Sequence, residues 1–219
     1  LYGFSYFGRL SYNFRNKYIG YFTLRREGTS KYQEEWGTFP AFGLGWVVSE
    51  ENFFQGVNFI NFLKFRGGWG KLGNDKIQPA AGQNTTEPVR LAVDDTEVTG
   101  TRTTSTFGYL GWETVAGTNV GVTAHFFDSR LNLEADYYIR DTENAAIPLS
   151  LKLQPGEVLR NVGVIRNSGL EMEITWNGDF TSDLRYTISG NFGTLKNEVR
   201  DLYGQEYILG GQAEFRQRT

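Results

Sequence analysis

Two carboxylates, Glu171 and Glu173, stand two residues apart in a segment where apolar and polar residues alternate. In a β-strand this spacing places both side chains on one face, about 6.6 Å apart along the strand. That separation resembles the distance between the two carboxylates of inverting glycosidases. The same face also carries Asn167 and Thr175, so a hydrated polar wall explains the pair without catalysis. The sequence favours this structural role.

The sequence contains few of the side chains that commonly bind metals or act as acids and bases. His125 is the single histidine, and the 219 residues contain no cysteine. Disulfides and thiolate metal sites are therefore excluded. His125 shares a strand face with Thr123 and Phe127, which indicates a residue of a polar wall or of its boundary rather than a metal ligand.

Two further patterns could bind ligands, and both have a simpler explanation. Asp94, Asp95 and Glu97 offer oxygen ligands for calcium, but the calcium-loop pattern is missing and solvated loop charge is expected. Residues 68–73 satisfy G-x-G-x-x-G, but the segment that follows reads as a loop instead of the helix that a dinucleotide site needs. The sequence therefore predicts no catalytic residue, no cofactor, no metal and no enzyme.

Aromatic residues near predicted strand ends are the only candidates for substrate binding. Trp36, Tyr109 and Trp112 occupy such positions, where aromatic faces can stack on sugar rings or peptide side chains. The alternative role is a belt of aromatic side chains at a membrane–water interface. All other substrate contacts are unknown at this point.

Composition narrows the class of protein. Lys and Arg number 22 against 25 Asp and Glu, so no basic footprint for nucleic acid is visible. Aromatic residues make up 16% of the chain and glycines number 27, which favours strands and turns. The longest apolar stretch, residues 39–48, is too short for a membrane helix, and no signal peptide is expected. The mean hydropathy of −0.42 fits a soluble protein or a membrane β-barrel.

Apolar and polar residues alternate with a period of two along most of the chain. The predicted strands span residues 2–14, 18–27, 38–48, 62–72, 112–126, 131–140, 167–176 and 184–192. Shorter connections are predicted at 15–17, 49–61, 128–130 and 177–183, and longer ones at 28–37, 73–106 and 142–162. The connection 49–61 is expected to hold a short helix capped by Ser49.

Short and long connections thus alternate along the chain and fall at opposite ends of the strands. Antiparallel strands with this asymmetry and with aromatic residues near their ends are typical of an outer-membrane barrel. A soluble sandwich rarely shows it. The predicted fold class is all-β, an antiparallel transmembrane β-barrel segment of about eight strands.

Several runs of sequence resemble one family. The runs are RREGTSKYQEEWGTFPAFGLGWVVSEENFF (25–54), LKFRGGWGKLGND (63–75), WETVAGTNVGVTAHFFDSRLNLEADYYIRDTENA (112–145) and VGVIRNSGLEMEITW (162–176). They resemble the barrel of SusC/RagA-type TonB-dependent transporters of the Bacteroidetes. The resemblance covers most of the chain, in order, and weakens at 73–106 and 142–160.

The resemblance implies an outer-membrane transporter that imports oligosaccharides or oligopeptides, energised through TonB. It implies a barrel of about 22 strands, a SusD-like surface lipoprotein, contact with outer-membrane lipid, and a possible dimer of transporter–lipoprotein pairs. Residues 1–219 are expected to form part of one TonB-dependent receptor β-barrel domain from the C-terminal half of the barrel, without the plug domain and the TonB-binding segment.

Three alternatives remain open from the sequence. The first is a siderophore or vitamin receptor of the TonB-dependent type. The second is a stand-alone eight-stranded outer-membrane barrel with an adhesive or structural role, since a barrel of that size can close by itself. The third is a secreted β-sandwich that binds a ligand.

Overall fold

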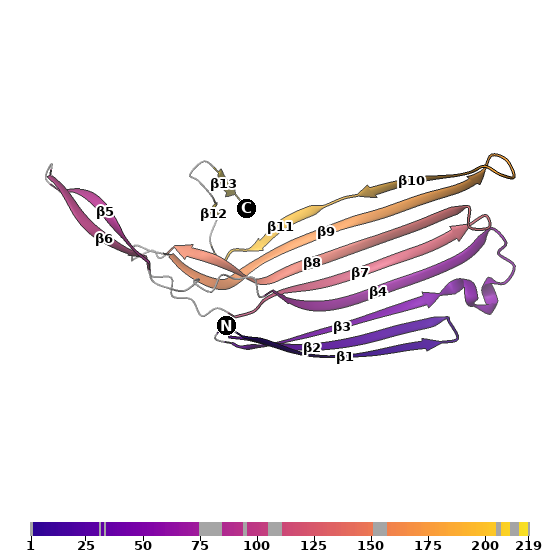
Figure 1. The fold of residues 1–219 in the computed structure, drawn as a ribbon, viewed down its shortest axis with the longest axis horizontal. Coiled ribbons are helices and arrows are strands. Elements are labelled where there is room, and N and C mark those ends of the chain that lie inside the picture. Colours follow the sequence, from indigo (N-terminus) through magenta and orange to yellow (C-terminus); the bar gives the residue numbers. More distant parts are fainter. Residues whose placement is uncertain are drawn as a thin grey trace.

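The computed structural model describes residues 2–30, 32, 34–74, 85–93, 96–104, 111–150, 157–204, 207–210 and 215–218. The described part is almost entirely β-structure (Figure 1). Its strands are β1 (Gly3–Phe14), β2 (Tyr18–Thr29), β3 (Trp36–Val47), β4 (Ile60–Asn74), β5 (Thr85–Val93), β6 (Thr96–Thr104), β7 (Glu113–Phe126), β8 (Leu131–Ser150), β9 (Glu157–Asp179), β10 (Arg185–Gly193), β11 (Lys196–Asp201), β12 (Tyr207–Gly210) and β13 (Phe215–Arg218).

One antiparallel sheet of nine strands contains most of these elements. Its order is β1-β2-β3-β4-β7-β8-β9-β10, and β11 follows β10 along the same edge of β9. Strands adjacent in sequence are therefore adjacent in space, except that β4 pairs with β7. The strands β5 and β6 form a separate hairpin between them, as do β12 and β13 at the C-terminal side.

Three short turns gather at one end of the sheet, as the sequence predicted, but the β3–β4 connection at the same end, residues 48–59, is longer than the β2–β3 connection, residues 30–35, at the other end. Residues 15–17, 127–130 and 180–184 connect strands there, at the right in Figure 1. The β5–β6 hairpin, which belongs to the long connection between β4 and β7, extends beyond the opposite end. In outer-membrane barrels the short turns face the periplasm and the longer loops face outward.

The two faces of the sheet differ in polarity because side chains alternate along each strand. We call the face that carries Tyr18, Trp46 and Leu133 the apolar face, and the opposite one the polar face. On β8 the apolar face runs from Leu131 to Ile139, which is about 27 Å along the strand. Allowing for strand tilt, this length approaches the apolar band of roughly 25 Å in outer-membrane barrels.

Charged side chains end the apolar band on the side of the long loops. Asp141 follows Ile139 on the same face of β8, and Arg166 lies opposite it on β9. Arg166 donates two hydrogen bonds to the Asp141 carboxylate, both 2.6 Å long. An ion pair at this position is compatible with water or polar head groups, and it marks where the apolar surface stops.

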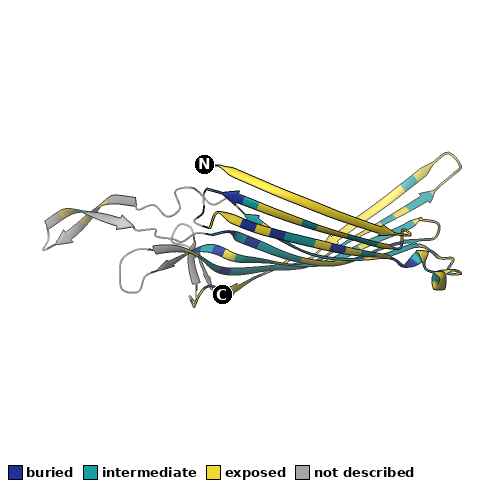
Figure 2. Cartoon of the chain, turned by 90° about the horizontal axis from the view of Figure 1, so that it is seen from below, coloured by how far each residue is buried: buried dark blue, intermediate teal, exposed yellow. Residues whose placement is uncertain are grey.

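The buried core is small, and most large apolar side chains are exposed. Tyr32, Phe39 and Trp112 form the one cluster of buried residues found in the described part, with Ala146 packed against it. The edge strand β1 is exposed along its whole length (Figure 2). Such exposure is expected of a wall whose apolar face is covered by something other than this chain.

Two predicted loops are wrong. Residues 73–106 contain the β5–β6 hairpin, and most of 142–162 belongs to β8 and β9, which end at Ser150 and begin at Glu157. Strict alternation requires one apolar and one polar environment on the two sides of a sheet. Beyond the apolar band the two sides of the sheet no longer differ in this way. The strands therefore continue there without the alternation of apolar and polar residues from which strands are predicted.

The helix expected after β3 is also wrong. The segment forms two short 3-10 turns, Val48–Glu50 and Asn52–Phe54, and neither has a side-chain cap. Ser49 lies inside the first turn rather than before it. No helix among the described residues is both long enough and apolar enough to cross a membrane.

Side-chain hydrogen bonds fix this connection at the short-turn end. Glu51 accepts hydrogen bonds from the Tyr18 hydroxyl at 2.6 Å, from Trp46 Nε1 at 3.2 Å and from Lys17 Nζ at 3.2 Å. Tyr18 and Trp46 are directly opposite each other on β2 and β3. The Glu51 carboxylate therefore connects the 3-10 turns to the ends of β2 and β3.

Candidate functional site: the polar face of the sheet

Charged side chains of the polar face form two rows that cross the strands. Register places Arg66, Gly121, Asp136 and Glu171 side by side on β4, β7, β8 and β9. The next row toward the short turns contains Lys64, Thr123, Glu134, Glu173 and Asn191. Pairing in the sheet thus gathers residues from positions 64 to 191 into one surface.

Arg66 is the centre of this surface. Its Nε donates to Asp136 Oδ1 at 3.0 Å, and a second nitrogen bonds the other oxygen of the same carboxylate. The guanidinium also contacts Glu134 Oε1 at 2.7 Å and Thr123 Oγ1 at 2.5 Å. Planar, two-point pairing of this kind fixes geometry as well as charge.

A glycine makes this ion pair possible. Gly121 on β7 lies between Arg66 and Asp136, and a Cβ built on it would lie 2.1 Å from Asp136 Oδ1 and 2.9 Å from Arg66 Nε. Any side chain at this position would occupy the space that the ion pair fills. A glycine within a strand often marks such a close approach.

The two glutamates with glycosidase-like spacing belong to this charged surface. Glu171 is directly opposite Asp136, and Glu173 is directly opposite Glu134. Like charges in opposed positions repel. Within the described side chains, neither Glu171 nor Glu173 forms an ion pair, whereas Asp136 and Glu134 both form ion pairs with Arg66. The arrangement is an acidic wall with one arginine, as expected for a hydrated surface.

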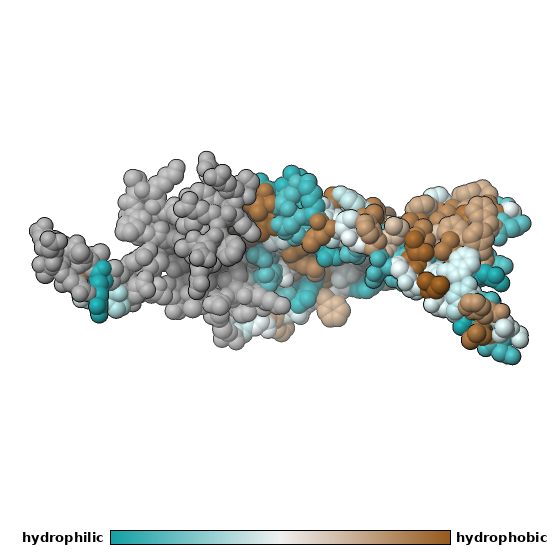
Figure 3. All heavy atoms as spheres, turned by 90° about the horizontal axis from the view of Figure 1, so that it is seen from above, coloured by the Kyte–Doolittle hydropathy of each residue, from teal (hydrophilic) through white to brown (hydrophobic). Residues whose placement is uncertain are grey.

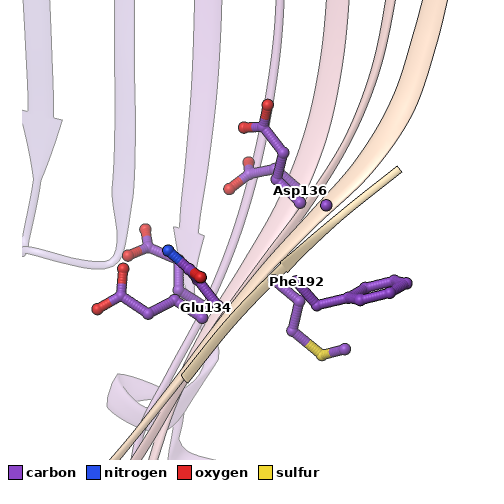
Figure 4. A pocket seen from close by; sticks show the side chains of 8 residues that line it. Glu134, Asp136 and Phe192 are labelled. Carbon is purple, nitrogen blue, oxygen red and sulfur yellow. The ribbon is translucent and has the colours of Figure 1, made fainter. Parts of the chain in front are cut away.

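A shallow hollow of about 500 Å³ lies over the acidic wall. Its lining includes Glu134, Asp136, Glu171, Glu173 and Asn191. In Figure 4 the carboxylates of Glu134 and Asp136 project to one side of the sheet, and the Phe192 ring projects to the other. Most of the lining thus belongs to the polar face, whereas Phe192 and Met172, which also border the hollow, belong to the apolar face.

A second hollow of about 360 Å³ lies closer to the long loops. Gly70 and Gly117, directly opposite each other on β4 and β7, are part of its lining, together with Tyr138 and Arg140 of β8. The Arg140 guanidinium carbon lies 4.9 Å from the centre of the Tyr138 ring. Glycines next to an aromatic ring and an arginine leave room for a solute to touch the wall.

The aromatic candidates for substrate binding, Trp36 and Trp112, have different surroundings in the structure. Trp36 is 40% exposed and lies on the apolar face, with Arg26 5.3 Å above its ring. Trp112 is 6% exposed and packs edge-on against Tyr32 and Phe39. Tyr109 lies outside the described residues. Trp36 thus fits the interfacial belt, and Trp112 has the position of a core residue.

The structure also shows where the histidine and the glycine motif singled out in the sequence lie. His125 lies on the polar face, 5.1 Å from the ring of Phe62. Residues 68–73 lie within β4 and continue as strand to Asn74, so no helix follows the glycine motif. Asp94 and Asp95, and the side chain of Glu97, lie outside the described part. No group of residues able to hold a metal ion occurs among the described ones.

Sequence reasoning missed Arg66, Tyr138 and Arg140. Alternation places each of them on a polar face, but register between strands distant in sequence is what brings Arg66 to Asp136. The usable signal was the lone arginine in a glycine-rich strand, LKFRGGWG, because a long charged side chain flanked by glycines has room to lie across its neighbours.

Known proteins are similar to this chain in sequence and in fold. The family described as TonB dependent receptor-like, beta-barrel, matches residues 2–213. The TonB-dependent receptor SusC of Bacteroides thetaiotaomicron is 33% identical over 212 residues, which cover 91% of this chain and 21% of SusC. The TonB-dependent receptor P39 of Formosa agariphila is 31% identical over 224 residues, which cover 94% of this chain and 20% of P39.

Solved structures agree with these matches. The RagAB peptide importer in its open–open state superposes with a TM-score of 0.81 at 21% identity, over 99% of this chain and 24% of that one. The chain thus spans about a fifth of the length of the relatives it matches. The open nine-stranded sheet is accordingly a segment of a larger barrel. Since the family matches nearly all of the sequence, this chain belongs to the TonB-dependent receptor-like β-barrel family, whose members lie in the outer membrane.

Proposed function

We propose that this chain forms part of the wall of an active outer-membrane transporter that imports oligosaccharides or oligopeptides. The observation that carries the proposal is the division of one sheet into an apolar face and a charged polar face. The apolar face suits contact with lipid, and the polar face suits a water-filled interior. Family membership supports the same conclusion.

The wall moves solute past fixed charges and makes no bonds. The hollow beside Tyr138 and Arg140 offers an aromatic face and a cation to a passing solute, and the acidic wall around Arg66 offers carboxylates. We propose that energy comes through TonB and that a SusD-like lipoprotein covers the outer end. Both would act through parts outside these residues, and two such pairs could assemble as a dimer.

Uptake by cells tests the transport function. A strain lacking the gene for the full-length protein should lose uptake of one labelled oligosaccharide or oligopeptide, and the intact gene should restore it. A strain lacking TonB should show the same loss. Unchanged uptake of every glycan and peptide tested, with a growth defect on a ferric siderophore or vitamin instead, would overturn the proposed substrate class.

Purification tests the partner and the size of the protein. The native polypeptide, extracted from outer membranes in detergent, should be several times longer than 219 residues and should retain a lipoprotein. Its intact mass and that of any bound chain decide this directly. A free polypeptide of about 24.8 kDa would contradict the proposal and leave an autonomous small barrel.

A further inference from the structure

Arg140 is an exposed cation on the polar face of β8. Arg66 and Arg166 each pair with a carboxylate. Among the described side chains, by contrast, Arg140 forms no ion pair and no hydrogen bond, and its contact is with the Tyr138 ring. A guanidinium carries five N–H donors. Arg140 thus keeps both its charge and its donors available to a solute.

Tyr138 limits where this guanidinium can go. The guanidinium carbon of Arg140 lies 4.9 Å from the centre of the tyrosine ring. The ring itself extends over a glycine of the next strand, since a Cβ built on Gly169 would lie 2.8 Å from the Tyr138 hydroxyl oxygen. Stacking on an aromatic face holds a guanidinium while its N–H groups stay free to donate. The cation is therefore kept beside the hollow that both residues line.

Asn167 on β9 adds a second donor next to Arg140. The two residues are directly opposite each other in register. Asn167 Oδ1 accepts a hydrogen bond of 2.6 Å from Asn197 Nδ2, so the free group of Asn167 is its amide nitrogen. That nitrogen has no acceptor among the described atoms. Donors without acceptors, one of them charged, complement an anion such as a carboxylate.

The acidic wall does not neutralise this pair of donors. Asp136 lies four residues from Arg140 along β8, and Glu171 lies four residues from Asn167 along β9. By strand rise this separation is about 13 Å. It exceeds the distance of about 8 Å over which physiological salt screens exposed charges. The hollow therefore has a cationic end and an acidic end that act separately.

The cationic end lies toward the long loops, near the level where the apolar band stops. The residue after Arg140, Asp141, is on the other face and pairs there with Arg166. In Figure 3 apolar surface lies toward the short-turn end, at the right, and a hydrophilic patch lies nearer the middle of the molecule. Because the longer loops of such barrels face outward, an entering solute meets Arg140 before the acidic wall.

We propose that Arg140 and Asn167 form a subsite that binds a carboxylate of the solute as it enters. This inference rests on the proposed transport function, because it requires the polar face to line a water-filled interior. Gly70 and Gly117 leave the floor of the hollow open, so the rest of the solute can lie against the backbone. Two sources share this chemistry: the terminal carboxylate of an oligopeptide and the uronate carboxylate of an oligosaccharide.

Thiol chemistry at the floor of the hollow tests the charge without any transport. This segment has no cysteine of its own, and any others in the full-length protein are replaced by serine. In G117C the new Cβ would lie 3.8 Å from Arg140 Cγ, an ordinary contact that the fold can accept. Rates are compared for an anionic sulfonatoethyl and a cationic trimethylammonioethyl methanethiosulfonate. The anionic reagent should be favoured at G117C and disfavoured at N191C, the control in the acidic hollow.

Replacement of Arg140 decides whether this residue is the cause. The ratio of the anionic to the cationic rate should fall roughly three- to tenfold in G117C/R140Q, since one unit charge changes the two rates in opposite directions. It should stay near the original value in G117C/R140K. Equal ratios in G117C and N191C, or a ratio that R140Q leaves unchanged, overturn the inference. If G117C does not fold, N119C in the same hollow takes its place.

Protection by solutes identifies the source of the carboxylate. Trialanine should slow the reaction of G117C with neutral N-ethylmaleimide more than trialanine amide does, if the carboxylate belongs to a peptide. Trigalacturonate should slow it more than its methyl ester does, if the carboxylate belongs to a sugar. Equal effects within both pairs overturn the inference. Protection by an acid, together with cellular uptake that does not depend on the gene, would instead refute the transport function and leave the subsite standing.

Discussion

Arg66 on β4 and Asp136 on β8 form a two-point ion pair although an entire strand, β7, lies between them. The pair crosses that strand at Gly121. It thereby couples two strands that share no backbone hydrogen bond.

The variant G121A should separate the pair. Its added methyl group would fall 2.1 Å from Asp136 Oδ1, so the ion pair or the strand must shift. We expect a loss of roughly 1 to 3 kcal/mol in the free energy of unfolding, typical of overpacking. Thermal unfolding of the full-length protein, followed by heat-dependent gel mobility, measures it. The control G193A lies on the same face with no atom within 4 Å of its new Cβ, and equal losses in both variants would refute the steric argument.

Removal of the guanidinium should destabilise the wall mainly through the charges it leaves behind. In R66M the carboxylates of Asp136 and Glu134 lose their partner beside two further glutamates. We expect a loss of about 1 to 2 kcal/mol, because the pair is partly exposed and screened by water. The double variant R66M/D136N should be more stable than R66M alone. If the second substitution adds its own loss instead, repulsion is not the cause.

Stability should depend on the ionisation of Glu51 in the β3–β4 connection. The Tyr18 hydroxyl, followed by Trp46 and Lys17, donates to this carboxylate and holds the pKa of Glu51 below its usual value of 4.5. A lowered pKa in the folded state means that the contribution is present above 4.5 and is lost as pH falls through the folded pKa. The unfolding temperatures of the parent and of E51Q should therefore differ most at neutral pH and converge in acid. The variant E50Q, at an exposed neighbour, serves as the control, and a constant difference at all pH values would contradict the argument.

Trp112 and Trp36 should respond differently to substitution. W112A removes the centre of the buried cluster with Tyr32 and Phe39 and should cost about 3 kcal/mol. W112F should cost less, because the buried indole Nε1 has no hydrogen-bond partner to lose. W36A should leave unfolding nearly unchanged. Because Trp36 lies on the apolar face, substrate uptake by W36A should also stay near that of the parent protein. Loss of uptake with normal unfolding, or loss of stability, would contradict its place in the interfacial belt.

Sequence alone predicted the strands that separate two environments. The segment around Leu131 to Ile139 alternates strictly because lipid and water lie on its two sides, and its strand was predicted to the residue at its start. The continuation of β8 to Ser150 was missed, since Ala145, Ala146 and Ile147 follow one another without alternation, and Ala145 and Ile147 are buried while Ala146 packs against the aromatic cluster. The glycine run around Arg66 indicated space, but its partner depends on register across β7, which no local pattern records.

The pairing of β4 with β7 across the intervening β5–β6 hairpin affects how the protein can change over evolutionary time. Closing a loop costs entropy that grows only with the logarithm of its length, about 0.6 kcal/mol for each doubling. Once β4 and β7 are paired along their full length, lengthening the insertion between them is nearly neutral for folding. Insertions or exchanges within this segment can therefore accumulate while the paired strands β4 and β7 beneath it stay the same.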